Sequence, residues 1–380
     1  MKTSRTWFAI LAVCAAVTIS LPTMVYADGD HGGDDSDVPR YFGVKFTRGG
    51  LGKLNAAGHA PIGVMGDHMH GEGELMLSYR YMFMDMGRNQ IGREEVSPDF
   101  IAANVANPNA PPATFRVVPT DMNMEMHMFG AMYAPTNWLT LMAMGMYVRK
   151  EMDHITFQGG AGTNRLGTFT TVTKGFANTK IGGLIKLYND GTHKIHFNAV
   201  VGLPTADIEN EARVLAPHNT APTLRGPYAM QSGSGSFDLH PGLTYNGKYE
   251  DWTWGAQWTS EIRTEDNDEG YNFGDIHRVT AWGQYSWFPW MSSSLRLAFE
   301  TEGRIDGEDD QIRAPIQTAD PDNYGGERVF IHGGLNFMGQ SGAIRGQRLA
   351  LEIGAPMYEN LNGPQMTREV IITLGWQYAF

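Results

Sequence analysis

Apolar and polar residues alternate along most of this chain with a period of two, which is typical of β-strands that have one apolar face. The last thirteen residues, REVIITLGWQYAF, show the alternation most clearly. Val370, Ile372 and Trp376 fall on one face, whereas Thr373 and Gln377 fall on the other. An apolar face that ends in aromatic residues is what we expect of the closing strand of a transmembrane β-barrel.

Twelve segments with this alternation are predicted to be strands. They cover residues 75–86, 121–133, 138–149, 176–188, 192–203, 237–248, 251–263, 275–287, 291–304, 327–339, 346–355 and 368–380. Short connections with turn residues alternate with long ones near 87–120, 150–175, 204–236, 264–274, 305–326 and 356–367. Short turns at one end and long loops at the other predict an all-β, transmembrane antiparallel barrel of about twelve strands. A barrel of ten or fourteen strands and a soluble all-β protein are the alternatives.

The first 27 residues have the pattern of a secretory signal peptide. Lys2 and Arg5 precede the apolar run WFAILAVCAAVTISL, and VYA before Asp28 fits a cleavage site. The alternative is a retained membrane anchor. Cys14 is the only cysteine of the chain, so the mature protein is predicted to lack disulfides and thiolate metal sites. The expected location is the bacterial outer membrane, reached with the help of the barrel-assembly machinery and surrounded by outer-membrane lipid.

The composition agrees with a barrel that has a polar interior. Charged residues make up 18% of the chain, glycine occurs 46 times, and mean hydropathy is −0.31. The formal net charge is −12, which argues against nucleic acid as a partner. Residues 28–74 are predicted to form an acidic tail followed by a plug-like segment rich in methionine and histidine, and residues 75–380 are predicted to form the barrel.

Arg80 indicates which face of the first strands points into the lumen. An arginine on the lipid face of a barrel costs about 2–4 kcal/mol near the bilayer midplane, so the face that carries Arg80 is predicted to point inward. The same alternation makes Leu77, Ala131 and Leu141 face lipid. It turns a column of methionines inward: Met82, Met84, Met86, Met122, Met124, Met126, Met128, Met142, Met144 and Met146.

Fifteen of the 22 methionines lie between residues 65 and 152. Methionine is a flexible residue that fills irregular gaps, so these side chains can simply pack a plug against the wall. Their thioethers are also soft ligands that select Cu(I), and imidazoles add affinity for Cu(II). The stretch HAPIGVMGDHMH, residues 59–70, supplies His59, Met65, Asp67, His68, Met69 and His70 as further candidate ligands. We therefore predict a copper ion as a cofactor or cargo, bound by these residues and the methionine column.

The remaining inward positions carry both signs of charge, which predicts salt-bridged packing. They are Lys180, Lys186, His196, Asp238, His240, Thr244, Glu261, Arg263, Arg278, Gln284, Arg296, Glu300, His332 and Glu352. No nucleophile motif stands out, and Ser236 and His240 lie too far apart along a strand for a direct hydrogen bond. The chain is therefore not predicted to be an enzyme.

Three stretches resemble a family of bacterial outer-membrane β-barrel proteins described as transporters, related to the barrels found with meta-cleavage phenol-degradation pathways. They are HAPIGVMGDHMHGEGELMLSYRYMFMDM, MEMHMFGAMYAPT and LTLMAM. The resemblance implies an outer-membrane location and a barrel fold. Two functions are expected: a barrel that binds and transports a soft metal, copper, or, as the alternative, a channel for small aromatic or hydrophobic molecules.

Overall fold

The computed structural model describes residues 40–41, 44–45 and 54–380. The predicted signal peptide and most of the acidic tail lie outside the described residues. β1 (Arg40–Tyr41) and β2 (Val44–Lys45) pair with each other as a short separate ribbon. The rest of the described chain is dominated by one antiparallel sheet.

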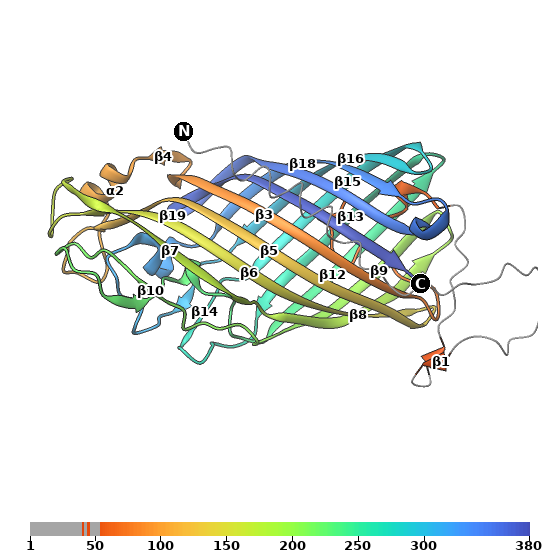
Figure 1. Cartoon of the computed structure of the whole chain (residues 1–380), viewed down its shortest axis with the longest axis horizontal. Coiled ribbons are helices and arrows are strands. Elements are labelled where there is room, and N and C mark those ends of the chain that lie inside the picture. The colour runs from red at the N-terminus through yellow and green to blue at the C-terminus, as the bar shows by residue number, and fades with distance from the viewer. Residues whose placement is uncertain (1–39, 42–43, 46–53) are drawn as a thin grey trace, which may run out of the picture. The chain divides into compact units, whose positions relative to one another are not determined.

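Eleven strands of this sheet close into a barrel, as predicted (Figure 1). They are β3 (Leu75–Gly92), β5 (Val117–Thr136), β6 (Leu139–Phe157), β8 (Thr179–Asn189), β9 (His193–Leu203), β12 (Asp238–Tyr249), β13 (Trp252–Arg263), β15 (Ile276–Phe288), β16 (Met291–Glu302), β18 (Gly326–Met338) and β19 (Gln347–Ala379). β19 pairs with β3 and closes the ring. The amide of Phe380 donates to the carbonyl of Leu75 at 2.7 Å, which confirms that the C-terminal residue ends a strand beside the first.

β19 is one long strand that reverses direction. Its first part pairs antiparallel with β18, and its last part pairs antiparallel with β3. A closed ring of antiparallel neighbours needs an even number of crossings, and the two arms of β19 supply it. The side chains of Arg348 and Gln377 join the arms at 2.6 Å. The predicted long loop at 356–367 is therefore wrong, because these residues continue the two strands to a tight turn at Gly363, where φ is +74°.

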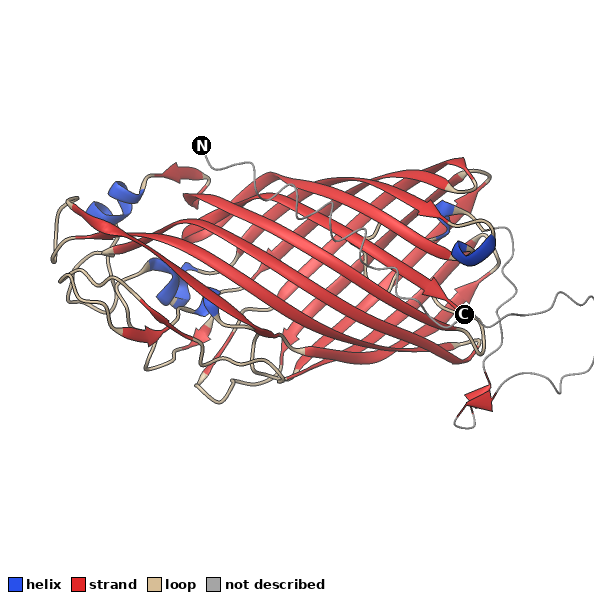
Figure 2. Ribbon diagram, in the orientation of Figure 1, coloured by secondary structure: helices blue, strands red, loops and turns tan. Residues whose placement is uncertain are grey.

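The connections differ in length at the two ends of the barrel (Figure 2). At one end, turns of two to eight residues join β5 to β6, β8 to β9, β12 to β13, β15 to β16 and β18 to β19. At the other end lie long loops that contain α2 (Pro98–Asn104), β4 (Glu94–Val96), β7 (Arg165–Phe176), β10 (Glu211–Arg213), β11 (Thr223–Arg225), β14 (Tyr271–Asn272) and β17 (Asp306–Gly307). We call the first the short-turn end and the second the long-loop end. The predicted loop 150–175 is also partly wrong, because β6 continues through it and pairs with β7.

The outer face of the sheet is apolar. Large side chains are exposed on it, including Leu77, Phe129, Leu141, Ile181, Leu243, Trp258, Val279, Leu297, Phe299, Ile331, Leu349 and Ile353. Exposed aromatic residues gather at the short-turn end: Trp138, Tyr188, Tyr249, Trp252, Trp287, Phe288 and Trp290. A belt of this extent, bordered by aromatic rings, is the outer surface of a membrane-spanning barrel. Among the residues that the structure describes, no helix is long and apolar enough to cross a membrane.

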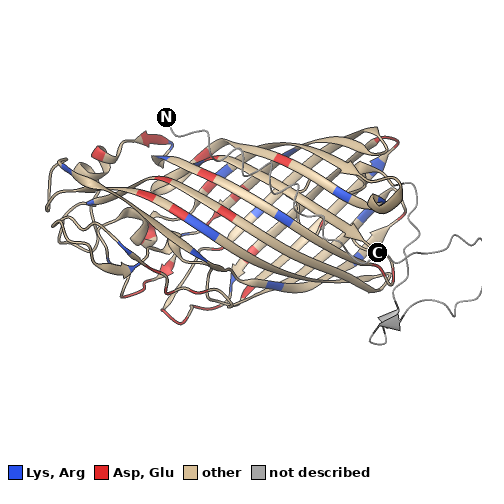
Figure 3. Cartoon of the chain, viewed as in Figure 1, with Lys and Arg blue, Asp and Glu red and all other residues tan. Residues whose placement is uncertain are grey.

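β3, β5 and β6 extend beyond this belt toward the long loops. Their outer face becomes polar there, and Arg149 contacts Glu125 at 3.5 Å. Asn123, Glu125 and His127 were predicted to lie on the outer face above the membrane. His127 Nδ1 contacts the Tyr79 hydroxyl at 2.8 Å, so it lies on the outer face of β5. Figure 3 shows charged positions on β5 and β6 toward the long-loop end.

Candidate functional site

Residues 54–74 form a plug inside the barrel near the short-turn end. The segment begins with the short helix η1 (Ala56–Gly58), and its amide at Ala56 donates to the carbonyl of Pro289 at 3.0 Å. Luminal side chains bind its backbone from five strands: Arg348 contacts Ala60 O at 2.6 Å, Gln284 contacts His59 O at 2.7 Å, Gln257 contacts Met65 O at 2.9 Å, Asn246 contacts Asp67 O at 2.7 Å and His196 contacts Gly66 O at 2.8 Å. Irregular backbone is tolerated inside a barrel when the wall supplies such partners.

Glycines allow the plug to follow the wall closely. Gly66 has a φ of +60°, a conformation that disfavours a side chain. At Gly63, an added Cβ would lie 2.3 Å from Glu352 Oε1. Gly375 of β19 leaves room for Ile62, whose Cδ1 would lie 2.4 Å from a Cβ there. The plug is therefore fitted to this lumen by residues that have no side chain.

Three polar side chains of the plug meet at one point. His59 Nδ1 lies 3.3 Å from His68 Nδ1, and His68 Nδ1 lies 2.9 Å from Asp67 Oδ1. The ligand atoms of His59, Asp67 and His68 all lie within 4.8 Å of one another. The ring of His70 lies beside that of His68, with 4.7 Å between their centroids, and its Nδ1 contacts Glu74 at 3.3 Å. We call His59, Asp67 and His68 the plug cluster.

Burial and mutual charge set the protonation of this cluster. Burial lowers the pKa of His59 well below its ordinary value, and repulsion by His68 lowers it further. Burial also lowers the pKa of His70, an effect that its hydrogen bond to Glu74 partly opposes. For Asp67, burial alone would raise the pKa, but the neighbouring His68 holds it below its ordinary value. His59 and His70 are thus neutral near pH 7, whereas Asp67 is a carboxylate.

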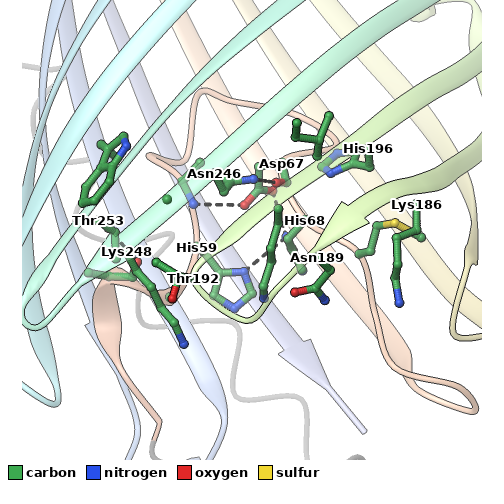
Figure 4. A pocket seen from close by; sticks show the side chains of 18 of the residues that line it. His59, Asp67, His68, Lys186, Asn189, Thr192, His196, Asn246, Lys248 and Thr253 are labelled. Carbon is green, nitrogen blue, oxygen red and sulfur yellow. Dashed lines mark hydrogen bonds and ion pairs between the residues drawn. The ribbon is translucent and has the colours of Figure 1, made fainter.

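The plug cluster lies at a cavity of about 310 Å³ at the short-turn end. Figure 4 shows His59, Asp67 and His68 pointing toward one another, with Asn246, Lys186 and Lys248 on the surrounding strands. The cavity is also lined by Trp254, Trp282, Tyr188, Ile195 and Lys194. It therefore offers neutral imidazole nitrogens, one carboxylate, aromatic rings and the amino groups of lysine.

The luminal methionines form a nearly continuous apolar wall, which we call the methionine sector. Four contacting groups follow one another from the long-loop end to the plug: Met122, Met152 and Met230 with Met86 and Met366; Met84, Phe330 and Ile371 with Met82, Met86 and Met124; Met128, Met144, Met146 and Val148 with Met65, Met82 and Met126; and Met76, Met132 and Leu184 with Met69 and Met142. Met86 and Met82 are shared between successive groups. The sector thus reaches from the external loops to the plug residues Met65 and Met69.

An apolar pocket of about 60 Å³ lies at the outer end of the methionine sector. Its walls come from loops far apart in the sequence, including Leu215, Pro227, Met230 and Ile316. His154 also lines it, with its ring stacked on Phe169 at 4.5 Å and its Nδ1 buried without a hydrogen-bond partner. Met230 belongs both to this pocket and to the outermost methionine group, so the pocket and the sector are contiguous.

The opposite side of the lumen carries ion pairs, and we call it the charged sector. Glu300 contacts both Arg278 and Arg368, and Arg368 Nη1 lies 2.8 Å from Glu300 Oε1. Arg328 Nη1 lies 2.8 Å from Glu302 Oε2, and its Nε lies 3.6 Å from Glu359. These three arginines and three glutamates balance in charge. A second group pairs Arg296 with Glu352, which also contacts His332 at 3.3 Å.

The predicted orientation of the wall is confirmed. Arg80, Met84, Met128 and Met144 are buried in the lumen, whereas Leu77 and Leu141 are exposed on the outer face. The predicted salt-bridged packing of the other luminal residues is also found, as in the charged sector. The structure brings His59, Asp67 and His68 together, places His70 next to them, and packs Met65 and Met69 against the methionine column. It does not bring the column itself to the imidazoles as one coordination shell.

Several residues of the site were missed. Met152 and His154 continue the inward alternation of β6, which could have been followed beyond residue 149. Met230 and Ile316 lie in loops, where no periodicity marks them. The hydroxyl of Ser236 donates to Asp238 at 2.8 Å, and His240 lies 3.9 Å from Glu261. These two residues, named as the nearest approach to a nucleophile and base, are therefore occupied by other partners.

Comparisons with known proteins identify the fold alone. No family model matches the sequence, and no curated protein matches it. An outer-membrane channel from Pseudomonas putida F1 is similar in structure, with a TM-score of 0.52 and 14% identity over 83% of this chain and 99% of that one. A FadL homologue from Pseudomonas aeruginosa has a TM-score of 0.42 and 8% identity over 86% and 98% of the two chains. A mutant of the monoaromatic hydrocarbon channel TodX has a TM-score of 0.43 and 10% identity over 82% and 91%.

Proposed function

We propose that this protein is a gated outer-membrane channel for small apolar molecules, such as monoaromatic compounds. The observation that carries the proposal is the methionine sector, which leads from the external apolar pocket to the plug. Thioether side chains are apolar and polarizable, and they change conformation easily. An apolar solute that moves along them leaves no polar group without a partner.

The charged sector supports the same proposal. A channel for ions or sugars needs luminal charges or polar groups that are free to bind the solute. Here Arg278, Arg328 and Arg368 are engaged by Glu300, Glu302 and Glu359 within the wall. This side of the lumen therefore acts as a support for the barrel, and the methionine sector is the part that accepts a solute.

Passage requires movement at two places. A cavity of about 150 Å³ accepts benzene in a well-characterised protein, whereas the external pocket measures about 60 Å³. The flexible side chain of Met230 is the one whose displacement would enlarge the pocket toward the lumen. At the other end the plug must shift, and the cavity of about 310 Å³ beyond it is large enough for an aromatic ring.

Copper conduction is a second candidate. It rests on one observation: Met65 and Met69 of the plug contact the methionine sector, and the imidazoles of His59 and His68 lie on the same segment. Cu(I) would move along thioethers and Cu(II) would bind the imidazoles. The comparisons give this function no support, so we place it after the apolar channel. Export by the predicted signal peptide, assembly by the barrel machinery and the absence of enzymatic activity belong to both proposals.

Uptake by liposomes tests the channel. The barrel, purified in detergent and reconstituted into vesicles, should speed the entry of toluene or phenol more than that of arabinose, a neutral polar solute. The matched control is a barrel with Met230→Trp, which fills the external pocket without touching the plug. We expect this variant to lower toluene uptake at least about tenfold. Equal rates for the two proteins, or faster entry of arabinose than of toluene, would remove the proposal.

A further inference from the structure

The plug cluster contains more acceptors than protons. His68 Nδ1 lies 2.9 Å from Asp67 Oδ1 and 3.3 Å from His59 Nδ1. A neutral imidazole nitrogen carries at most one proton, so it can donate fully to only one of these two partners. If it donates to Asp67, the nitrogen of His59 faces a donor that is already engaged. Hydrogen bonds alone therefore leave this contact poorly satisfied.

Two further nitrogens in the same place have no partner. His68 Nε2 and His70 Nε2 are buried without a hydrogen bond in the described structure. His70 is only 6% exposed and lines the cavity. A buried polar atom without a partner costs about 1–3 kcal/mol, so four imidazole nitrogens of one short segment gather where protein groups do not satisfy them. A bound cation would.

The distances suit a metal ion. Two nitrogens that each lie about 2.0–2.1 Å from a tetrahedral ion are about 3.3–3.4 Å apart, and His59 Nδ1 and His68 Nδ1 are 3.3 Å apart. The ligand set of two imidazoles and one carboxylate is typical of Zn(II) and Cu(II) sites. We propose that His59, His68 and Asp67 bind one divalent late transition ion, with His70 beside it, and that Cu(II) binds more tightly than Zn(II).

The surroundings of the ligands are ordered as a metal site requires. The amide of Ala60 donates to Asp67 Oδ2 at 3.0 Å, which leaves Oδ1 directed at His68. Gln284 and Asn246 hold the backbone carbonyls of His59 and Asp67. Partners of this kind orient ligands, and their loss commonly weakens metal binding 10–100-fold. Lys194 and Lys248 also line the cavity, but both are exposed, so solvent screens their repulsion of a cation.

An ion at this position would tie the two ends of the plug together. His59 lies near the start of the plug and His68 near its end, so one ion bridges both. The segment between them holds Met65, which packs against the methionine sector. A bound ion therefore favours the closed plug and its removal favours opening. The site is a regulatory one, and its existence does not depend on which solute the channel passes.

Copper binding to the purified protein tests the site. The full chain would carry His31→Gln, because His31 lies in the acidic N-terminal stretch and offers a separate imidazole. After metal removal, Cu(II) is titrated and followed by electron paramagnetic resonance, and Zn(II) is added as a competitor. We expect one Cu(II) per chain with hyperfine coupling to at least two nitrogens, displaced only by a large excess of Zn(II). No nitrogen coupling at one equivalent would overturn the proposal, and this result needs no further variant.

Substitutions assign the ligands. His68→Gln and Asp67→Asn, each in the same background, should weaken Cu(II) binding about 100-fold or more. His193→Gln is the matched control, because His193 contacts Tyr245 on the outer face at the same end of the barrel. Unchanged affinity in His68→Gln, or an equal loss in His193→Gln, contradicts the assignment. Toluene uptake measured with and without Cu(II) is scored separately, so a failed channel and a failed metal site give different results.

Discussion

The methionine sector and the charged sector line the same lumen and follow the same alternation, yet they differ in what they allow. Side chains of the charged sector are fixed by ion pairs, as when Glu300 contacts both Arg278 and Arg368. Side chains of the methionine sector make only nonpolar contacts with one another. One wall cannot move without separating buried charges, whereas the other can rearrange at little cost. The comparison teaches that a solute path and its support can share one barrel.

The charged sector should be the less tolerant of the two. Glu300→Gln removes a buried carboxylate that holds two guanidinium groups, and breaking such a pair typically costs about 3–5 kcal/mol. We expect the free energy of unfolding, measured by urea titration of the barrel in lipid vesicles, to fall by this amount. Glu327→Gln, at an exposed position of β18, is the matched control and should change little. If both variants unfold alike, the charged sector is not the support proposed here.

The outer face should respond to charge according to depth. Leu297 lies near the middle of β16 and is 49% exposed on the apolar belt. Leu297→Arg should destabilise the barrel by about 2–4 kcal/mol, and Tyr249→Arg, at the short-turn end, by about 0–1 kcal/mol. The same urea titration measures both. Equal effects at the two positions would mean that this belt does not lie in lipid.

The methionine sector should tolerate substitution by leucine. Met→Leu keeps volume and apolarity, and such exchanges usually cost less than about 1.5 kcal/mol each. We expect Met82→Leu, Met84→Leu and Met126→Leu to stay within this limit one at a time. Their unfolding curves, set beside that of Glu300→Gln, would sharpen the contrast between the sectors. A loss as large as that of Glu300→Gln would show that the methionines are as constrained as the ion pairs.

Alternation alone predicted the barrel and its inner face. The position of Arg80 was enough to orient the first three strands, because a charge in lipid is costly. The turn of β19 was missed because Pro356, Asn362, Gly363 and Pro364 have the composition of a loop, although the strands continue on either side of the turn. β7 was missed for a similar reason, since the segment that it belongs to follows a run of glycines.

The plug could be predicted only in part. The cluster of histidines and methionines at 59–70 indicated a segment near the lumen, but the contact of His59 with His68 depends on how the plug turns at Gly66. Luminal side chains from six strands fix that turn and position, among them Gln257 and Thr140. The external pocket depends on loops more than a hundred residues apart. No local pattern records such contacts.

The central claim is that apolarity of the methionine sector, rather than its sulfur, carries the solute. Toluene uptake by reconstituted vesicles tests it most directly in two triple variants at Met82, Met84 and Met126, one with leucine and one with glutamine. Leucine keeps the wall apolar without thioethers, and glutamine keeps a similar length but adds polar groups. We predict uptake within about twofold of the unsubstituted protein for leucine and at least about tenfold slower for glutamine. Uptake that is lost with leucine, or retained with glutamine, would contradict the account.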